Sequence, residues 1–560
     1  MLVYPFRYVR WLISSLLRSL GKPPDYVTIL IEADLPALPD PPGPLWQRFI
    51  SKPRPSMKEL GENFDLIARD PRTKGVILHL RPAEMAVATR QDLRDLIAKL
   101  RKGGKRVVAW APFYTTGSYY IATACDEILL MPVGEIRPLG IATAGMFLAD
   151  GLAKVGISAD FVQISPYKSA ADMLTKSKMS PELREQITWL LKSNHEQFLG
   201  AIMTSRQLDL DGAKVLVDGT PYNDDEALAK KAVDKLVTEE DLPTYLASGG
   251  APARIGSWDQ ARGKLRTPAP TLGLGKYVAV LRVEGLIIDG RSERPPVKPP
   301  VPIPLVGGER SGDLSVVQAA RQIAGDKRAA AAVLYVNSGG GSATASEAMR
   351  NALEKINVSK PLVVAMGPVA ASGGYWVSTP ARWIVARPGT ITGSIGVLTG
   401  KFVTGPMWSK LLFNREVVSF GENAALADTG KPFTDAQRAI MKKEIDHIYA
   451  RFLDKVGAAR NMKPEDVHPM AAGRVWTGKQ ALDRGLVDEL GGLDTAVAKA
   501  RQLAGLSEAV PFREVKAARK MIAPQAATAV AYAGFVLEGL KLLGHAQPLA
   551  LMDFLPEETL

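Results

Sequence analysis

Ser372 lies in the segment GPVAASGGYW (367–376), where most neighbours have very small side chains. Glycines beside a serine let another backbone approach closely, and a serine at the start of a helix faces exposed N–H groups and the positive end of the helix dipole. These features suit a hydroxyl that attacks a carbonyl carbon, as in acyl transfer. The segment therefore predicts a nucleophile at Ser372, with Gly373 letting a substrate carbonyl approach.

A second glycine-rich turn, NSGGG (337–341), follows an apolar run. Unobstructed N–H groups in such a turn suit the oxyanion that forms during acyl transfer, and one donor is worth about 3 kcal/mol in the transition state. Taken alone, each turn is more simply explained as a tight loop that accepts only glycine. The presence of both turns in one chain is what favours acyl transfer.

A serine nucleophile needs a base, and the usual base is histidine. None of the five histidines is clearly placed for this role. A lysine can replace histidine where burial or neighbouring groups lower its pKa from about 10.4 towards about 7–8. The histidines are His79, His195, His447, His468 and His545.

The chain contains an internal duplication. FYTTGSYYIAT (113–123) aligns without gaps on VAASGGYWVST (369–379), and similar matches extend over most of both halves. Two copies of one unit are therefore expected, with a short segment before them and a tail after them. These parts are residues 1–21, 22–265, 275–510 and 511–560.

Functional residues are expected where one copy departs from the other. The first copy has Thr116 at the position of Ser372, and it lacks the glycine turn as well. The second copy has Ala424 at the ungapped counterpart of Lys168. The two losses are complementary, because a site assembled from both copies would contain a hydroxyl and an amine. We predict Lys168 as the general base, with Lys401 as the reserve candidate.

Each copy is predicted to have an α/β fold. Apolar runs such as YVAVLRVEG, AAVLYVN and PLVVAMG are typical of buried parallel strands, and helical patterns such as ATASEAMRNALEKI follow them. Short βα units therefore succeed one another. Between the first strand and the next helix of the second copy, the proline-rich residues 289–313 predict a mobile loop.

Residues 1–21 predict an amphipathic N-terminal helix, in which three arginines and Ser14 share one side and apolar residues take the other. The arginines interrupt the run of about 20 apolar residues that a spanning helix needs. Two interpretations stay open: a helix lying in the membrane interface, favoured by the arginine face and Trp11, and a helix docked on its own protein. A second apolar stretch, 526–544, could pack on the first or on lipid.

Composition excludes several classes of protein. With 560 residues, 46% of them hydrophobic, the chain suits roughly two to four globular domains. Cys125 is the single cysteine, so an intrachain disulfide framework is excluded, and no Cys/His cluster signals a metal site or cofactor. The net charge of +12 comes from scattered basic residues, which argues against nucleic-acid binding and suits solubility or anionic lipid surfaces.

Four stretches together resemble the signal peptide peptidase A family in its long, duplicated form, also called protease IV. They are VNSGGGSATASEAMR, MGPVAASGGYWVSTPARWIVARPGTITGSIGV, YKSAADMLTKSKMSPELRE and AAGRVWTGKQALDRGLVDELGG. The resemblance covers nearly all of residues 22–505. It implies tandem ClpP/crotonase-like units, built as repeated β-β-α spirals, in a serine peptidase of family S49.

The same resemblance assigns the roles of the catalytic side chains. Ser372 is the nucleophile and Lys168 is the general base. Ser394, in the GSIG motif, holds the lysine amine by a hydrogen bond. The first copy thus supplies the base, and the second supplies the nucleophile and the oxyanion hole.

Backbone groups complete the implied site. Gly340 joins the nucleophile's own N–H in the oxyanion hole, and Gly341, Gly373 and Tyr375 are assigned to substrate binding. For Tyr375 and its neighbour Trp376, a place in the core stays open beside a place lining the groove. One departure from the family pattern concerns Gly339, which stands where the family usually has proline. The turn is therefore less preorganised than its counterpart in the family.

The family's known behaviour sets the expected function. It implies a membrane-associated endopeptidase that cleaves remnant signal peptides or other apolar, extended peptides through an acyl-enzyme. It also implies a homotetramer at the bacterial inner membrane, on the periplasmic side. Two alternatives stay open at this stage: a crotonase-type acyl-CoA enzyme, and a catalytically silent membrane scaffold.

Overall fold

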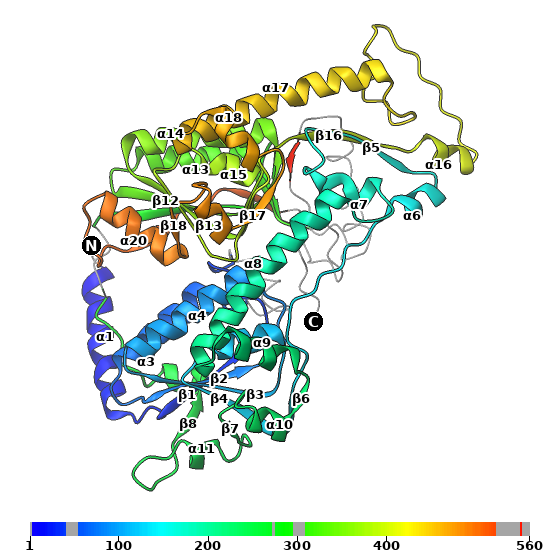
Figure 1. Cartoon of the computed structure of the whole chain (residues 1–560). Coiled ribbons are helices and arrows are strands. Elements are labelled where there is room, and N and C mark those ends of the chain that lie inside the picture. The colour runs from blue at the N-terminus through cyan, green and yellow to red at the C-terminus, as the bar shows by residue number, and fades with distance from the viewer. Residues whose placement is uncertain (1–2, 41–53, 271–274, 295–307, 522–548, 552–560) are drawn as a thin grey trace. The chain divides into compact units, whose positions relative to one another are not determined.

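The computed structural model describes most of the chain (Figure 1). The central part of the predicted proline-rich loop, residues 295–307, lies outside the described residues. The apolar stretch predicted at 526–544 also lies outside them. The described residues are 3–40, 54–270, 275–294, 308–521 and 549–551.

Two compact units make up the chain, and they do not coincide with the two sequence copies. The first unit contains the residues up to Ala142 and those from Asn194 to Gly275. The second unit contains Thr143–Ser193 together with the residues from Lys276 onward. A segment of the first sequence copy, the one that carries Lys168, is therefore part of the second structural unit.

A seven-stranded sheet forms the centre of the first unit, in the order β6-β4-β3-β2-β1-β8, with β7 beside β4. Its four central strands are parallel, and every residue of β2 is buried, as expected for a parallel strand that is covered on both faces. The strands are β1 (Tyr26–Ile31), β2 (Gly75–Leu80), β3 (Arg106–Tyr114), β4 (Glu127–Ile136), β6 (Tyr222–Asn223), β7 (Lys235–Leu236) and β8 (Ile255–Ser257).

Most helices of the first unit, though not α1 or α11, contribute to an apolar core that they share with the sheet. Helix α3 begins with a capping box, in which Ser56 accepts the N–H of Glu59 and the Glu59 carboxylate accepts the N–H of Ser56. The helices of this unit are α1 (Val3–Leu20), α3 (Met57–Arg69), α4 (Val87–Lys102), α5 (Thr116–Ala122), α9 (Leu210–Asp218), α10 (Asp224–Ala229), α11 (Leu242–Tyr245) and α12 (Trp258–Arg262).

The second unit is built on a larger mixed sheet whose centre is the parallel set β9, β12 and β13. The strands are β5 (Ser158–Gln163), β9 (Tyr277–Ile288), β10 (Ser292–Arg294), β11 (Arg310–Gly312), β12 (Ala329–Ser342), β13 (Leu362–Ala371), β14 (Trp383–Ala386), β15 (Ile391–Gly393), β16 (Leu398–Val403), β17 (Val475–Thr477), β18 (Glu489–Leu490), β19 (Phe512–Glu514), β20 (Arg519–Met521) and β21 (Leu549–Leu551). The predicted α/β fold with two duplicated, ClpP-like units is confirmed.

Helices also alternate with the strands of the second unit. Helix α8 (Pro181–Arg206) begins in this unit, to which its residues up to Ser193 belong. The others are α6 (Ala149–Lys154), the 3₁₀ turn η1 (Ser169–Ala171), α7 (Asp172–Thr175), α13 (Asp313–Gly325), α14 (Ala343–Ser359), α15 (Gly373–Ser378), α16 (Gly405–Lys410), α17 (Asp435–Arg460), α18 (Pro464–Val467), the 3₁₀ turn η2 (His468–Met470), α19 (Gly478–Asp483) and α20 (Leu493–Leu503).

The segment Thr143–Ser193, which comes from the first sequence copy, is held in the second unit by a strand. Strand β5 pairs antiparallel with β16 over its whole length, and Val162 of β5 lies in the apolar core of the second unit. The Asp160 carboxylate accepts the backbone N–H of Phe433 and pairs with Arg438 on α17. These contacts fix the chain that leads to Lys168.

The predicted glycine turn differs from expectation, because it is part of a strand. Residues 337–341 form the end of β12, which is irregular at this point, and α14 begins directly after it. At Gly341, where φ is +152°, an added Cβ would lie 2.0 Å from the Ile287 carbonyl oxygen. Glycine is therefore required here so that β12 can pass close to β9.

Helix α1 confirms the predicted N-terminal helix, and its apolar residues are exposed. Ile13, Leu16 and Leu17 are 58%, 65% and 65% exposed. The indole N–H of Trp11 instead donates to the Thr267 carbonyl at 3.0 Å, so this side chain faces its own protein. Within the described residues, no helix combines the length and the apolar character that crossing a membrane demands.

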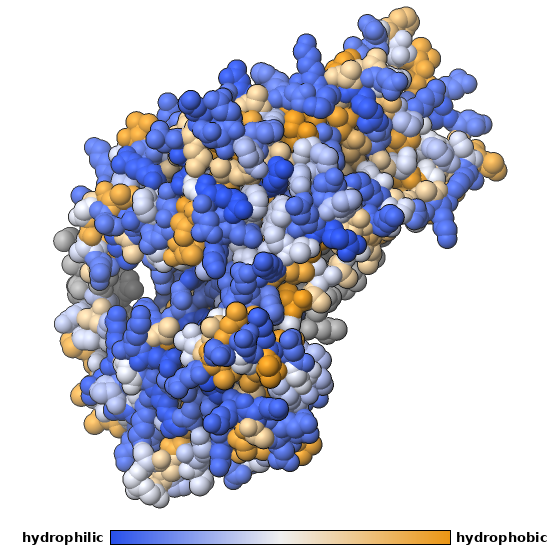
Figure 2. Space-filling view, viewed as in Figure 1, coloured by the Kyte–Doolittle hydropathy of each residue, from blue (hydrophilic) through white to orange (hydrophobic). Residues whose placement is uncertain are grey.

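Large apolar side chains are also exposed after α16. Leu412, Val418 and Phe420 are 88%, 86% and 94% exposed. Apolar surface gathers at this end of the second unit, at the upper right of Figure 2. Because soluble proteins rarely leave large apolar patches uncovered, this segment indicates an interaction surface.

Candidate active site

Ser372 sits at a sharp turn between β13 and α15. Its backbone has φ 55° and ψ −115°, a conformation that non-glycine residues rarely adopt and that costs about 1–3 kcal/mol. The turn is held because the Ser372 N–H donates to the Gly393 carbonyl at 2.8 Å. Gly374, two residues later, lies so close to β12 that an added Cβ would be 2.5 Å from the Ser338 carbonyl oxygen. The strained turn therefore fixes the direction of the hydroxyl.

The structure brings the three predicted side chains together in the second unit. The Lys168 amine nitrogen Nζ lies 2.7 Å from Ser372 Oγ. It lies 2.9 Å from the Ser394 carbonyl oxygen and 3.0 Å from Ser394 Oγ. Lys168 is 1% exposed and Ser372 is fully buried.

Burial sets the charge state of the Lys168 amine. Desolvation lowers the pKa of Lys168 well below its ordinary value, because an ammonium group loses its hydration in this position. The three oxygens that contact Nζ belong to uncharged groups, so no carboxylate among them opposes that shift. The arrangement therefore favours a neutral amine whose lone pair can accept a proton.

Ser394 follows β15 in a second left-handed conformation, with φ 50°. Its N–H donates to the Arg474 carbonyl at 2.6 Å, which ties it to the chain entering β17. Both its hydroxyl and its carbonyl consequently face the lysine amine.

A loop to which sequence analysis gave no role at the site encloses Lys168 from the other side. Gly473 has φ +84°, and an added Cβ would lie 2.6 Å from the Lys168 Cα atom. Ala472 before it also has a positive φ, of 53°, and its N–H donates to the Tyr449 hydroxyl at 2.9 Å. The Ser165 hydroxyl donates to the Ala472 carbonyl. Gly473, the glycine of the AAGRV sequence (471–475), is thus the feature of the sequence that indicates this close approach to the lysine.

The predicted oxyanion donors are engaged within the protein. The Gly340 N–H donates to Ser338 Oγ at 3.1 Å, and the N–H of Ser372 is bound to Gly393 as described above. The first turn of a helix leaves its N–H groups without intrahelical acceptors, and Gly373 is the first residue of α15. The N–H of Gly373, next in the chain to Ser372, is therefore a further candidate donor.

The other predicted residues fall into two groups. Gly341 lies at the end of β12 beside the glycines already described. Tyr375, which was expected either to belong to the core or to line the groove, is fully buried in the core, and its hydroxyl donates to the Leu486 carbonyl at 2.8 Å. The reserve base Lys401 donates to the carbonyls of Leu426 and Asp428 rather than to Ser372.

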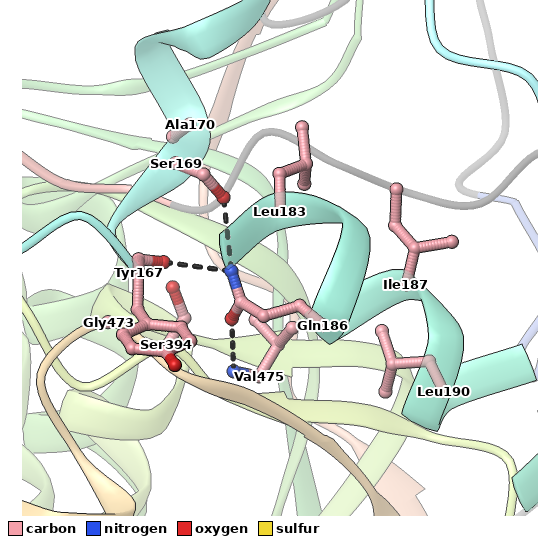
Figure 3. Close-up of a pocket in the computed structure, with 10 residues that line it drawn as sticks. All are labelled: Tyr167, Ser169, Ala170, Leu183, Gln186, Ile187, Leu190, Ser394, Gly473 and Val475. Atoms are coloured by element: carbon pink, nitrogen blue, oxygen red, sulfur yellow. Dashed lines mark hydrogen bonds between the residues drawn. The ribbon is translucent and has the colours of Figure 1, made fainter. Parts of the chain in front are cut away.

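A small pocket lies beside the lysine, between the 3₁₀ turn η1 and α8 (Figure 3). Leu183, Ile187 and Leu190 of α8 form its apolar wall, and Ser394 and Gly473 lie on the opposite side. The described residues contain no cluster of three or more His, Cys, Asp or Glu side chains placed to hold a metal ion.

The corresponding position in the first unit has a different arrangement. The Thr116 hydroxyl donates to the Gly140 carbonyl at 2.8 Å. The guanidinium group of Arg90 lies over Gly117, where an added Cβ would be 2.7 Å from its central carbon. The hydroxyl that replaces the serine is therefore held by its own unit's backbone.

Comparison with known proteins agrees with this geometry. Residues 99–251 and 354–507 each match peptidase family S49. The chain is 34% identical to Protease 4 of Salmonella typhi, covering 81% of this chain and 74% of that protein, and 31% identical to Protease 4 of Haemophilus influenzae, covering 78% and 71%. It is 30% identical to the chloroplastic serine protease SPPA of Arabidopsis thaliana, covering 80% and 66%. The chain therefore belongs to peptidase family S49, as a serine peptidase of the signal peptide peptidase A group that its motifs resemble.

Proposed function

We propose that this peptidase works through a dyad of Ser372 and Lys168. The observation that carries the proposal is the set of contacts around Nζ. A neutral amine has two N–H donors and one lone pair: the donors match the hydroxyl and carbonyl oxygens of Ser394, and the lone pair then faces Ser372 Oγ. Every hydrogen-bonding position of a deprotonated lysine is thereby used.

In the first half-reaction, the Lys168 amine takes the Ser372 proton while Oγ forms a bond to the scissile carbonyl carbon. The tetrahedral intermediate collapses when its C–N bond breaks and the lysine ammonium gives its proton to the leaving amine. In the second half, the amine takes a proton from water, whose oxygen attacks the acyl carbon. The Ser372 ester bond breaks, and Oγ regains the proton from the ammonium.

Two further groups support these steps. Ser394 keeps the amine aimed at Oγ through both half-reactions. The Gly373 N–H stabilises the oxyanion, in place of the Ser372 N–H that the sequence predicted. A preorganised backbone donor of this kind contributes about 3 kcal/mol to the transition state.

The substrate is an apolar peptide in extended form, such as a remnant signal peptide. Support comes from β21, whose backbone pairs antiparallel with Gly340–Ser342 of β12 and also with Leu398 of β16. The glycine end of β12 therefore accepts an extended strand beside the catalytic turn, as strand addition requires. The apolar wall of the adjoining pocket suits apolar side chains.

Two observations count against the alternatives. A crotonase-type enzyme needs no serine nucleophile. Here the serine hydroxyl is buried, lies on a strained backbone turn and contacts a base. A silent scaffold would not require a lysine to be buried against a serine. The departure at Gly339 leaves the catalytic contacts of Ser372 in place.

The exposed apolar side of α1 supports membrane association in the interfacial mode. Ile13, Leu16 and Leu17 present apolar groups to the surroundings, and the net charge of +12 favours an anionic surface. Trp11 docks the helix on its own unit instead of serving as an interfacial anchor. We propose that the protein is associated with the bacterial inner membrane, on the periplasmic side expected from the family.

The duplication suggests how copies of the chain assemble. Strand β5, which comes from the first sequence copy, pairs with β16, which comes from the second copy. The counterparts of these two strands by repeat alignment are residues 414–419 and 142–147, and neither forms a strand in the single chain. Residues 411–420 are all exposed. We propose that 414–419 of one chain pairs with 142–147 of the next, a head-to-tail contact that closes into a ring such as the expected tetramer.

Catalysis is tested by labelling Ser372 with a fluorophosphonate probe across a pH series. Because the amine must be neutral, the labelling rate should rise with pH and level off below the ordinary lysine range of about 10.4. Ser372→Ala and Lys168→Arg should lose at least about 1,000-fold in labelling and peptide cleavage. Lys178→Ala, an exposed lysine of the same segment, should behave like wild type. Full activity of Lys168→Arg would refute the dyad.

Stability should depend on pH through Lys168. Its pKa is lowered in the folded state, so between that value and about 10.4 the unfolded chain binds more protons and folding becomes more favourable as pH rises. Lys168→Met cannot titrate at this position. In this window the free energy of unfolding of the wild type, relative to that of Lys168→Met, should therefore increase by up to about 1.4 kcal/mol per pH unit. Urea unfolding of both proteins at several pH values measures the difference. A difference that stays constant with pH would contradict a buried, titrating amine.

Membrane association is tested by co-sedimentation with anionic phosphatidylglycerol vesicles. Ile13→Asp combined with Leu17→Asp should abolish binding, because it places two charges on the exposed apolar side of α1. Leu314→Asp combined with Val358→Asp adds the same charges at exposed positions on α13 and α14 and should bind like wild type. Binding by the α1 variant at the wild-type level would exclude this helix as the contact.

Assembly is tested by analytical ultracentrifugation. Val418→Asp combined with Phe420→Asp should dissociate the oligomer, because both side chains lie in or next to the segment proposed to pair with the next chain. Met146→Asp, 75% exposed in the opposing segment, should have the same effect. Val358→Asp, at a position 79% exposed on α14, is the control. An oligomer unchanged by both changes would rule out this contact.

A further inference from the structure

A single buried amide connects the segment that carries the lysine to the strand beside Ser394. Gln186 lies on α8 and is 2% exposed. Its Nε2 donates to the Tyr167 carbonyl at 3.0 Å and to Ser169 Oγ at 3.2 Å, and its Oε1 accepts the Val475 N–H at 3.0 Å. Figure 3 shows these three hydrogen bonds converging on the amide.

The partners of this amide lie on both sides of the dyad. Tyr167 and Ser169 are the chain neighbours of Lys168. Val475 pairs antiparallel with Gly393, the residue before Ser394. One side chain therefore hydrogen-bonds both to the residues flanking Lys168 and to the strand beside Ser394, in addition to the Ser165–Ala472 hydrogen bond described above.

We infer that Gln186 is a positioning residue of the active site, which holds the Lys168 backbone in register with Ser394 and Ser372. The inference rests on the proposed Ser372–Lys168 dyad. Only a neutral amide offers two donors and an acceptor in this geometry. A 1 Å displacement of a catalytic group can cost about 100-fold in rate, so the loss of this link should reach the chemistry although Gln186 touches no reacting atom.

Charged groups near the amide make contacts of their own, although Asp172 Oδ1 is buried without a hydrogen-bond partner among the described residues. Glu185 accepts the Tyr167 hydroxyl at 2.6 Å, and the guanidinium of Arg474 lies over the Tyr167 ring at 4.0 Å. The buried Asp172 carboxylate accepts the Ser180 hydroxyl and pairs with Lys176. A carboxylate at position 186 would therefore be a new charge next to the lysine segment.

The chain supplies a matched control in Gln480 of α19. Its Nε2 donates to the Trp189 carbonyl on the same helix α8 at 3.1 Å, and its Oε1 accepts the Thr477 N–H on the same strand β17 at 3.0 Å. Gln480 thus ties the same two elements together, but it makes no hydrogen bond to the described residues that flank Lys168. A purely structural role for Gln186 predicts equal effects at the two positions.

The experiment compares Gln186→Leu, Gln186→Glu, Gln480→Leu and Lys168→Met in the full-length protein. The readouts are fluorophosphonate labelling of Ser372 against pH and the melting temperature. Gln186→Leu should label about 10–100-fold more slowly at every pH, with a melting temperature close to that of Gln480→Leu, which labels near the wild-type rate. Gln186→Glu should move the pH midpoint of labelling upward, because a nearby carboxylate favours the ammonium form.

Each other outcome has a defined meaning. Wild-type labelling by Gln186→Leu, or a loss that Gln480→Leu matches, overturns the positioning role. If Gln186→Leu does not fold, an unchanged pH midpoint in the nearly isosteric Gln186→Glu overturns it as well. Wild-type labelling by Lys168→Met instead overturns the dyad itself, so the two failures are distinguishable.

Discussion

The contact between a buried amine and a strained hydroxyl is the constraint on which the second unit depends. Lys168 is 1% exposed, with Nζ 2.7 Å from Ser372 Oγ. Burying an ammonium group without a carboxylate partner is costly, so the fold favours the neutral form that can accept a proton. The neighbouring groups are accordingly uncharged: the hydroxyl and carbonyl oxygens of Ser394 accept hydrogen bonds from the amine and do not stabilise its ammonium form as a carboxylate would. Burial and basicity are thus two consequences of one packing arrangement.

Strain in the backbone accompanies this arrangement. Ser372, Ser394 and Ala472 have φ values of 55°, 50° and 53°, in the region that favours glycine. Each of their N–H groups is held by a hydrogen bond to the neighbouring structure: to Gly393, to Arg474 and to the Tyr449 hydroxyl. A conformation that costs about 1–3 kcal/mol per residue persists because these contacts leave the chain no alternative. At Ser372 and Ser394 the strained backbone directs two side chains at the Lys168 amine, and at Ala472 it shapes the loop that encloses the lysine.

The sequence predicted the residues of the site better than their surroundings. Comparison of the two copies located Ser372 and Lys168, because each has lost its counterpart in the other copy, and the resemblance added Ser394. The same reasoning missed Gln186, whose role depends on which strand α8 packs against. It could not decide between core and groove for Tyr375, because an aromatic residue next to a nucleophile has the same local pattern whether it faces a substrate or the core. Similarly, neighbouring residues along the chain do not reveal that the N–H of Ser372 is taken by Gly393.

The exchange of one segment between the copies explains why their losses are complementary. Thr143–Ser193 packs into the second unit, so a complete pair needs the lysine of the first copy and the serine of the second. The reciprocal pairing, under the proposed assembly, would bring residues 416–428 of one chain to Thr116 of another. That segment carries Ala424, and the Thr116 hydroxyl is bound to Gly140. Because no proton has to be transferred at that junction, the reciprocal contact needs only shape and apolar surface, and residues 411–420 expose six apolar side chains among their polar ones.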